Sequence, residues 1–294
     1  MTASRTNIFL AGGCCRGEEK GEETMIRLDK YLADMGIGTR SEVKRLIRQG
    51  RVRIDDIPCR APEQKVEPGN VVVSCDGMPV AYQKFYYYMF HKPAGVVTAR
   101  EDGREKTVME VLLEEGLSCP AFAELSPAGR LDKDTEGLLL ITNDGALIHR
   151  LLAPGWHVEK IYYARIHGKM TEEDVKAFAA GIQCSDFKAL PAKLELLSTK
   201  EALVKASSAG NREEALLTEE SLSIKEPESE VLIHLQEGKF HQVKRMVQAV
   251  GKEVLYLKRL SMGALQLDDT LRPGEWRELT KEEKEALGCQ EEKG

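Results

Sequence analysis

One short stretch combines a carboxylate, a turn and a buried strand in a way that suits chemistry. Residues 129–145 read GRLDKDTEGLLLITNDG, so Asp132 lies just before the apolar run of the strand. A turn beside a sheet can hold one carboxylate rigidly and leave it open to a ligand. This pattern makes Asp132 a candidate nucleophile or base, and its competing interpretation is an ordinary turn residue.

The same acidic residues allow two other kinds of site. Their spacing mimics the start of a calcium-binding EF-hand loop, but the twelfth position is Asn143 instead of Glu, and an apolar strand fills the loop. We therefore exclude an EF-hand. A carboxylate hydrolase would need a second acid, and Asp134 is the nearest candidate. We expect its side chain to point away from that of Asp132.

Three further stretches accompany the first. They are KPAG over 92–95, KIY over 160–162 and EGKFHQVKRM over 237–246, and PGEWREL follows over 273–279. With GRLDKDTEGLL over 129–139, they resemble, in the same order, the signatures of the RsuA/RluB/RluE/RluF family of bacterial pseudouridine synthases. The resemblance covers about residues 25–200 and 230–280. Four ordered motifs are strong evidence, whereas any one alone is weak.

The resemblance implies a role for each matching residue. Asp132 matches the family's essential aspartate. Tyr162 matches the tyrosine that packs on the target base and helps remove the C5 proton, and Lys244 matches the basic residue that pairs with the aspartate. Arg130 matches an arginine linked to RNA binding and nucleotide flipping, and Lys92 of KPAG is expected to contact RNA. By position alone, Tyr162 could pack in the core and Lys244 could be a solvated helix residue.

The implied reaction needs little beyond these side chains. Pseudouridine forms when the bond from uracil N1 to the ribose breaks, the base turns, and C5 joins the sugar. No atoms enter or leave, so no cofactor and no metal is expected. The carboxylate of Asp132 acts as a nucleophile at the sugar or as a base on it, and a nearby cation such as Lys244 favours its ionised form. Stacking on Tyr162 offsets part of the cost of extruding the base.

A second group of residues is suited to binding phosphates. Residues 40–53 hold six basic side chains and one acid, although the whole chain has a net charge of −6. The six are Arg40, Lys44, Arg45, Arg48, Arg51 and Arg53. Residues 25–75 resemble an S4 RNA-binding domain, which commonly precedes this catalytic domain. Phosphate contacts there would position the enzyme without reading the RNA sequence, and the competing interpretation is a solvated helix face.

The elements that must position these residues mix helices and strands without a regular βαβ alternation. We predict helices over 28–35, 41–49, 146–152, 172–180 and 241–250. We predict strands over 51–54, 71–74, 85–90, 137–142, 161–167, 193–197 and 231–236. This pattern predicts an α+β fold: a small S4 (α-L-type) module, followed by a catalytic domain built on a largely antiparallel mixed β-sheet flanked by helices.

Shifts in composition predict the domains. We expect a disordered extension over 1–24, an S4-like domain over 25–80, a catalytic domain over 84–280 with a mobile acidic insertion at about 207–229, and a charged tail over 281–294. Met25 stands directly before the motif-bearing sequence, so we hypothesise that translation starts there. Seven cysteines without a CxxC pair indicate a reducing compartment, and we expect a cytoplasmic monomer.

The resemblance also implies a target. The sequence FHQVKRM over 240–246 looks like the small-subunit branch, whereas the large-subunit branch tends to carry Asn-Arg near this position. We therefore expect isomerisation of a uridine in 16S ribosomal RNA, at position 516, with ribosomal RNA or a small-subunit assembly particle as partner. The alternatives are a 23S target of the same family or a non-catalytic RNA-binding ribosome-assembly factor. No membrane partner is expected, because no apolar run reaches the ~18 residues of a span.

Overall fold

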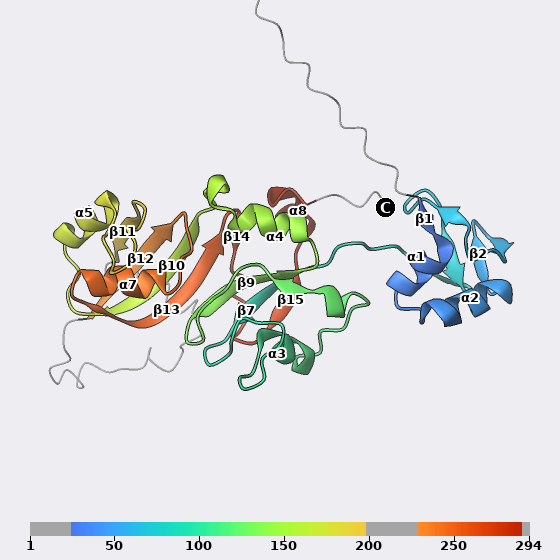
Figure 1. Ribbon diagram of the computed structural model, residues 1–294, viewed down its shortest axis with the longest axis horizontal. Helices are drawn as coiled ribbons and strands as arrows, with labels where there is room; N and C mark the ends of the chain where they lie inside the picture. The colour runs from blue at the N-terminus through green and yellow to red at the C-terminus, as the bar shows by residue number, and fades with distance from the viewer. Residues whose placement is uncertain (1–24, 198–227, 290–294) are drawn as a thin grey trace, which may run out of the picture.

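The computed structural model describes residues 25–197 and 228–289. The expected extension over 1–24, nearly all of the expected insertion over 207–229, and residues 290–294 lie outside this part of the chain. Two groups of secondary structure are joined by a stretch of irregular chain after residue 79, as Figure 1 shows. Within the described ranges, no helix is long and apolar enough to cross a membrane.

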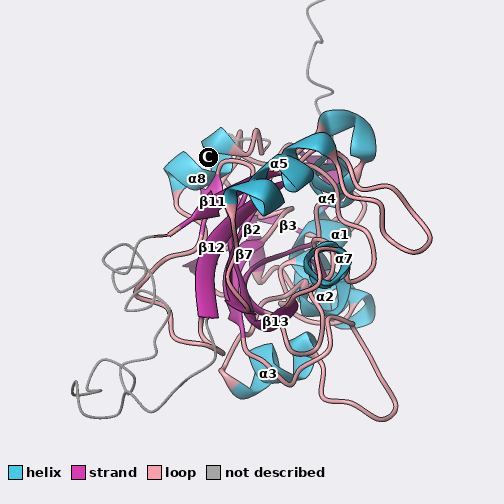
Figure 2. Ribbon diagram, turned by 90° about the vertical axis from the view of Figure 1, so that its left-hand side faces the viewer, coloured by secondary structure: helices cyan, strands magenta, loops and turns pink. Residues whose placement is uncertain are grey.

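The small N-terminal domain packs two helices with short strands (Figure 1), and it lies behind the larger domain in the view of Figure 2. Its elements are β1 (Ile26–Arg27), α1 (Leu28–Asp34), α2 (Arg40–Arg48), β2 (Val52–Ile54), β3 (Ile57–Cys59), β4 (Lys65–Val66), β5 (Val73–Cys75) and β6 (Met78–Pro79). The sheet runs in the order β3-β2-β5-β6, and β1 pairs with β4. A capping box between Thr39 and Glu42 starts α2, whose Val43 and Ile47 are buried in the domain's core. The outward face of α2 is therefore left to its basic residues.

The larger domain is built on one mixed sheet. Its strands are β7 (Tyr87–Lys92), β8 (Ser126–Pro127), β9 (Glu136–Thr142), β10 (Lys160–His167), β11 (Lys193–Leu196), β12 (Glu228–Leu235), β13 (Glu253–Met262), β14 (Leu265–Gln266) and β15 (Trp276–Glu278). The order is β11-β12-β10-β13-β9-β7-β15, with β8 beside β9 and β14 beside β13. Among the described strands of this sheet, every pair is antiparallel except β9 with β13. The α+β fold with a largely antiparallel sheet is therefore confirmed.

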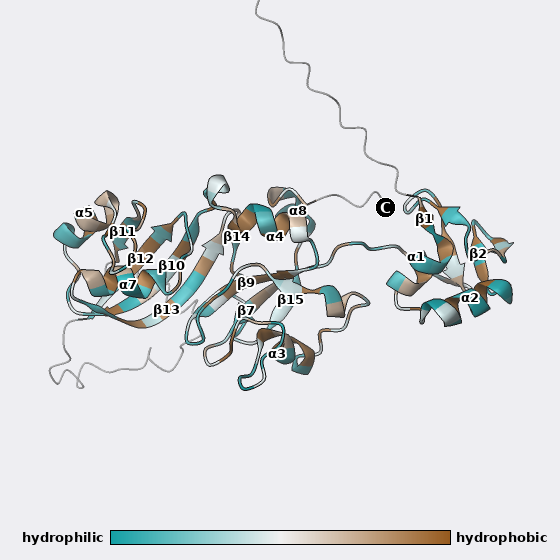
Figure 3. Ribbon diagram, viewed as in Figure 1, coloured by the Kyte–Doolittle hydropathy of each residue, from teal (hydrophilic) through white to brown (hydrophobic). Residues whose placement is uncertain are grey.

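Helices cover this sheet through three clusters of buried apolar side chains. The helices are α3 (Val108–Glu114), α4 (Gly145–Leu152), α5 (Glu172–Ala180), α7 (Gln242–Ala249) and α8 (Lys281–Ala286), with 3-10 turns at η1 (Phe122–Glu124) and η2 (Pro154–Trp156). Helices α5 and α7 pack against β10, β11 and β12. Helix α3 packs on one face of β7 and β9, and α4 packs on the other. The central strands accordingly carry many hydrophobic residues, brown in Figure 3.

The longest described strand was not predicted. Strand β13 lies between β10 and β9, in the middle of the sheet. Its Lys258 and Arg259 are buried, and the Arg259 guanidinium donates to the carbonyl of Leu138 in β9 at 2.8 Å. A buried strand of this kind usually reads as a nearly continuous apolar run. Two adjacent cations interrupt that pattern, so the sequence concealed the strand.

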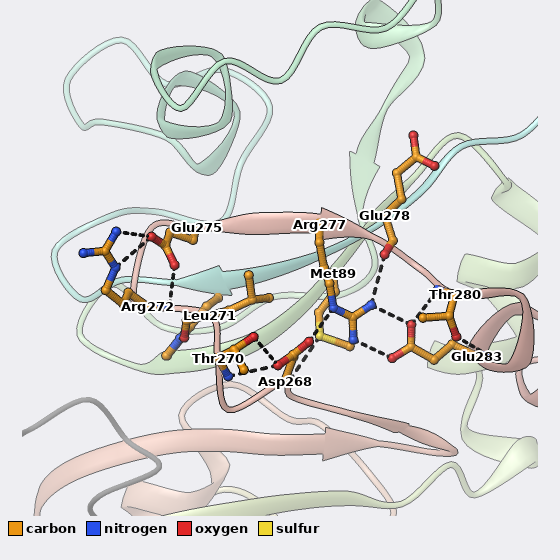
Figure 4. Close-up of polar contacts among 11 residues, drawn as sticks. Met89, Asp268, Thr270, Leu271, Arg272, Glu275, Arg277, Glu278, Thr280 and Glu283 are labelled. Carbon is orange, nitrogen blue, oxygen red and sulfur yellow. Dashed lines mark hydrogen bonds and ion pairs between the residues drawn. The ribbon is translucent and has the colours of Figure 1, made fainter.

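One arginine anchors the C-terminal segment, as Figure 4 shows. Arg277 of β15 donates to Asp268 at 2.6 Å and to both carboxylate oxygens of Glu283 at 2.8 Å. Hydrogen bonds from Thr270, together with Arg277, lower the pKa of Asp268 to about 2. The segment from residue 281 was expected to be a charged tail. Its described part begins as helix α8, and Leu287 is buried in the larger domain.

Candidate active site

The candidate carboxylate lies on a tightly held loop that leads into β9. The backbone N–H of Thr135 donates to the carbonyl of Asp132 at 3.1 Å, which closes a turn. The hydroxyl of Thr98 accepts from the N–H of Leu131 at 3.1 Å and donates to the carbonyl of Leu131 at 2.8 Å. Thr98 is buried, so water does not compete for these bonds. The backbone is therefore fixed on both sides of Asp132. Sequence reasoning missed Thr98, because no local signal links it to Leu131.

Lys92 lies behind this loop. Its side chain is fully buried, and its ammonium donates to the carbonyls of three residues, at 3.0 Å for Pro93, 3.2 Å for Lys133 and 2.8 Å for Thr135. Burial lowers the pKa of Lys92 to about 8, and nearby carboxylates act in the opposite direction. Lys92 was expected to contact RNA, whereas in this structure its buried ammonium is enclosed by three backbone carbonyls. It holds the loop that carries Asp132.

A small pocket opens beside Asp132. Its lining includes Arg130 from the same loop, Tyr162 from β10, and His241 at the start of α7. The side chain of Asp132 is 25% exposed, so its carboxylate is partly desolvated and still open to a ligand. Tyr162 packs its ring against the apolar cluster beneath α5 and α7, whereas Tyr163 is buried on the opposite face of the sheet. Of the two neighbouring tyrosines, Tyr162 is thus the one at the pocket.

Lys244 connects two carboxylates at the edge of this pocket. Its ammonium lies 2.6 Å from each carboxylate oxygen of Asp134 and 3.8 Å from Oδ2 of Asp132. The ring Nε2 of His241 lies 3.5 Å from Oδ1 of Asp132. Both oxygens of Asp132 therefore face a nitrogen that is able to carry positive charge.

Asp134 does not point away from Asp132, and that prediction is wrong. Residues 132–135 form a turn, so both carboxylates approach the same ammonium of Lys244. Burial raises the pKa of Asp134, but the hydrogen bonds and charge of Lys244 outweigh that effect and leave the pKa below its ordinary value. Asp134 therefore shares the cation that the family resemblance assigned to Asp132 alone.

The six basic residues of the small domain lie on or near its surface. Lys44 is half-buried and the five arginines are exposed. Arg51 forms an ion pair with Asp76, and Lys44 lies 3.8 Å from Asp29. Arg53 donates to a backbone carbonyl. Among the residues that the structure describes, no carboxylate lies within ion-pair distance of the other three, which are Arg40, Arg45 and Arg48.

Two family profiles match the sequence. One is described as RNA pseudouridylate synthase and matches residues 86–249, which is more than half of the chain. This chain belongs to the RNA pseudouridine synthases. The second profile, S4 domain, matches residues 26–72 of the synthase. The protein is therefore an RNA-modifying isomerase with an S4 domain before its catalytic domain, as the motifs predicted.

Relatives of this pseudouridine synthase resemble it over both domains. It is 43% identical over 259 residues to an uncharacterized RNA pseudouridine synthase of Bacillus subtilis, which covers 88% of this chain and 96% of the relative. It is 37% identical over 264 residues to ribosomal small subunit pseudouridine synthase A of Vibrio parahaemolyticus. That alignment covers 89% of this chain and 99% of the relative. A crystal structure of a pseudouridylate synthase is 30% identical to this chain and superposes on it with a TM-score of 0.55. The match covers 89% of this chain and 99% of the solved one.

Proposed function

We propose that this synthase isomerises a uridine of small-subunit ribosomal RNA, with position 516 of 16S RNA as its target. The relative from Vibrio parahaemolyticus is named for the ribosomal small subunit and aligns over 99% of its own length. Phe240 and His241, which resemble the small-subunit branch, stand beside the pocket. The enzyme works as a cytoplasmic monomer on ribosomal RNA, either alone or within an assembling small subunit.

The observation that carries the assigned reaction is the convergence of side chains from three separate motifs at Asp132 and its pocket. Tyr162 lines the same pocket, and Lys244 approaches the carboxylate from α7. These residues come from a turn, a strand and a helix that are far apart in the sequence. A protein that only binds RNA has no need for a partly desolvated carboxylate between two nitrogen donors.

The chemistry assigned to Asp132 follows from its surroundings. Its carboxylate attacks the sugar as a nucleophile or removes a proton from it as a base. In either route the bond from N1 to the ribose breaks and its electron pair remains with uracil. The base then turns and C5 bonds to the sugar, as the bond from Asp132 to the sugar breaks in the first route or the abstracted proton returns to the sugar in the second. The C5 proton leaves, and N1 regains a proton. Lys244 places a positive charge 3.8 Å from Oδ2 of this carboxylate.

The remaining groups act on the base and the backbone. The ring of Tyr162 forms one wall of the pocket, where it stacks on the extruded uracil and helps remove the C5 proton. Arg130 is exposed at the mouth of the pocket, where its guanidinium binds a phosphate beside the flipped nucleotide.

Pseudouridine mapping of ribosomal RNA from cells with and without this gene tests the proposal. Carbodiimide modification followed by primer extension should show one signal in 16S RNA that disappears with the gene. A gene that encodes Asp132→Asn should fail to restore it. If a 23S signal disappeared instead, the assigned reaction would still hold, but the target would lie in 23S RNA. An unchanged pattern would contradict a ribosomal RNA substrate and favour an assembly factor.

The basic face of α2 should contribute to RNA affinity through phosphate contacts. We expect the triple change of Arg40, Arg45 and Arg48 to Gln to weaken RNA binding and to reduce the slope of log K against log salt by roughly 2 to 3. The control replaces Lys281 of α8 and Arg272 by Gln, and its slope should equal that of the wild type. Binding titrations at several salt concentrations measure both. An unchanged slope in the triple variant would mean that this face is only solvated.

A further inference from the structure

An exposed aromatic ring stands at the mouth of the pocket. Phe240 is 75% exposed, more than any other large apolar side chain in the described part of the chain. It lies between two residues that line the pocket, Lys239 and His241. Its ring stacks on the imidazole of His241, with centroids 3.8 Å apart and planes inclined by 18°. Nε2 of that imidazole lies 3.5 Å from Oδ1 of Asp132. The catalytic carboxylate, the imidazole and the phenyl ring are therefore neighbours in that order.

The loop that carries this ring is held by hydrogen bonds, although the ring itself faces solvent. His241 adopts a left-handed backbone conformation with φ of 50°. The N–H of Lys239 donates to the side-chain oxygen of Gln242 at 2.9 Å, and the Gln242 amide donates to Glu237 at 2.6 Å. Gln242 is buried. The loop is therefore ordered by contacts that do not involve the phenyl ring, and packing does not explain why a phenylalanine stands there.

Two cations stand next to Phe240: Lys239 precedes it in the chain, and the guanidinium of Arg245 lies 3.4 Å from its backbone oxygen. The ammonium of Lys239 and the guanidinium of Arg245 lie over a second aromatic ring, that of Phe187, at 4.4 Å and 4.6 Å from its centroid. Lys188 beside it is exposed. Interleaved aromatic rings and cations are the features that bind single-stranded nucleic acid, because bases stack on the rings and phosphates pair with the cations.

We propose that Phe240 is a stacking platform for the base next to the target uridine. The inference rests on the proposed role of Asp132, because a uridine whose sugar reaches Asp132 leaves its neighbour in the chain at the mouth of the pocket. That neighbour loses a stacking partner when the uridine is extruded, and the outer face of Phe240 replaces it. Every base has a face that can stack, so the platform accepts any of the four bases.

The test compares wild-type enzyme and Phe240→Ala on an RNA hairpin that contains the target uridine. Two further hairpins have an abasic residue directly before or directly after that uridine. We expect Phe240→Ala to lower kcat/KM by roughly 5- to 100-fold, mainly through KM. One abasic hairpin should lower kcat/KM of the wild type by a similar factor and that of Phe240→Ala by much less. Phe240→Tyr, which keeps a ring, should stay close to the wild type.

Trp156→Ala is the matched control. Trp156 is 62% exposed but, unlike Phe240, it neither stacks on His241 nor adjoins a residue that lines the pocket, so its removal should leave kcat/KM unchanged on all three hairpins. The proposal is overturned if Phe240→Ala matches the wild type, or if both abasic residues reduce kcat/KM equally in the two enzymes. Binding titrations on the same hairpins separate this from the proposed function. If the wild type binds without turnover, the proposed function fails, and the Kd comparison still tests the platform.

Discussion

Replacing Asp132 by asparagine is expected to abolish turnover while leaving the fold and RNA affinity nearly unchanged. The carboxamide has the same shape, and the turn around it is held by backbone groups and by Thr98 instead of its own side chain. Loss of a base costs roughly 10²- to 10⁴-fold in rate, and loss of a nucleophile costs up to about 10⁶-fold. Single-turnover measurement on an RNA hairpin gives the factor, and its size separates the two routes open to this carboxylate.

Asp134→Asn is the matched control for this experiment. Asp134 is two residues away and bound to the same lysine, but its side chain is 70% exposed. We expect this variant to keep turnover within about tenfold, because Asp132 still has Lys244 and His241 as neighbours. Full activity of Asp132→Asn would refute the assigned role. Loss of activity only in Asp134→Asn would move the catalytic assignment to that residue.

Gly137→Ala is expected to disrupt the pairing of strands β9 and β13, which supports the site. Gly137 has φ of +107°, and a Cβ there would stand 2.2 Å from the carbonyl oxygen of Arg259 and 2.6 Å from its nitrogen. Both contacts are backbone atoms of β13, where Arg259 pairs with Gly137, so no side chain can move aside. Strands β9 and β13 would have to separate, which would break the bond from Arg259 to Leu138 and shift the loop that carries Asp132.

This substitution should destabilise the enzyme by roughly 3 to 5 kcal/mol, which is the range of large single-residue effects. For a domain of this size, that lowers Tm by about 6–20 °C. Gly145→Ala is the control, because its Cβ would meet no atom within 4 Å, and Gly145 starts helix α4. Alanine there should leave Tm unchanged or raise it slightly. Calorimetry measures the Tm of both variants. Equal Tm values for Gly137→Ala and Gly145→Ala would show that the strands can separate at little cost.

The local pattern of apolar and capping residues was sufficient to predict most of the helices and strands around the site. The predicted helix over 172–180 matches α5, and the strand predicted over 161–167 matches β10 to within one residue. Such elements carry their own period of apolar residues and their own caps, so neighbouring residues specify them. Strand β13 has the opposite character, because its central Lys258 and Arg259 are buried by partners in β9 and β10 that only folding supplies.

Local motifs were enough to predict Asp132 as the candidate carboxylate, its turn before a buried strand, and the family to which the chain belongs. These features are local, since each depends on a few consecutive residues. The partners of the charged side chains, in contrast, depend on how the chain folds. Lys244 and Asp134 are 110 residues apart, and the burial of Lys92 depends on a loop 41 residues away. Charges interact across space regardless of their distance along the chain, so a cation's partner is settled only when the sheet brings the loops together.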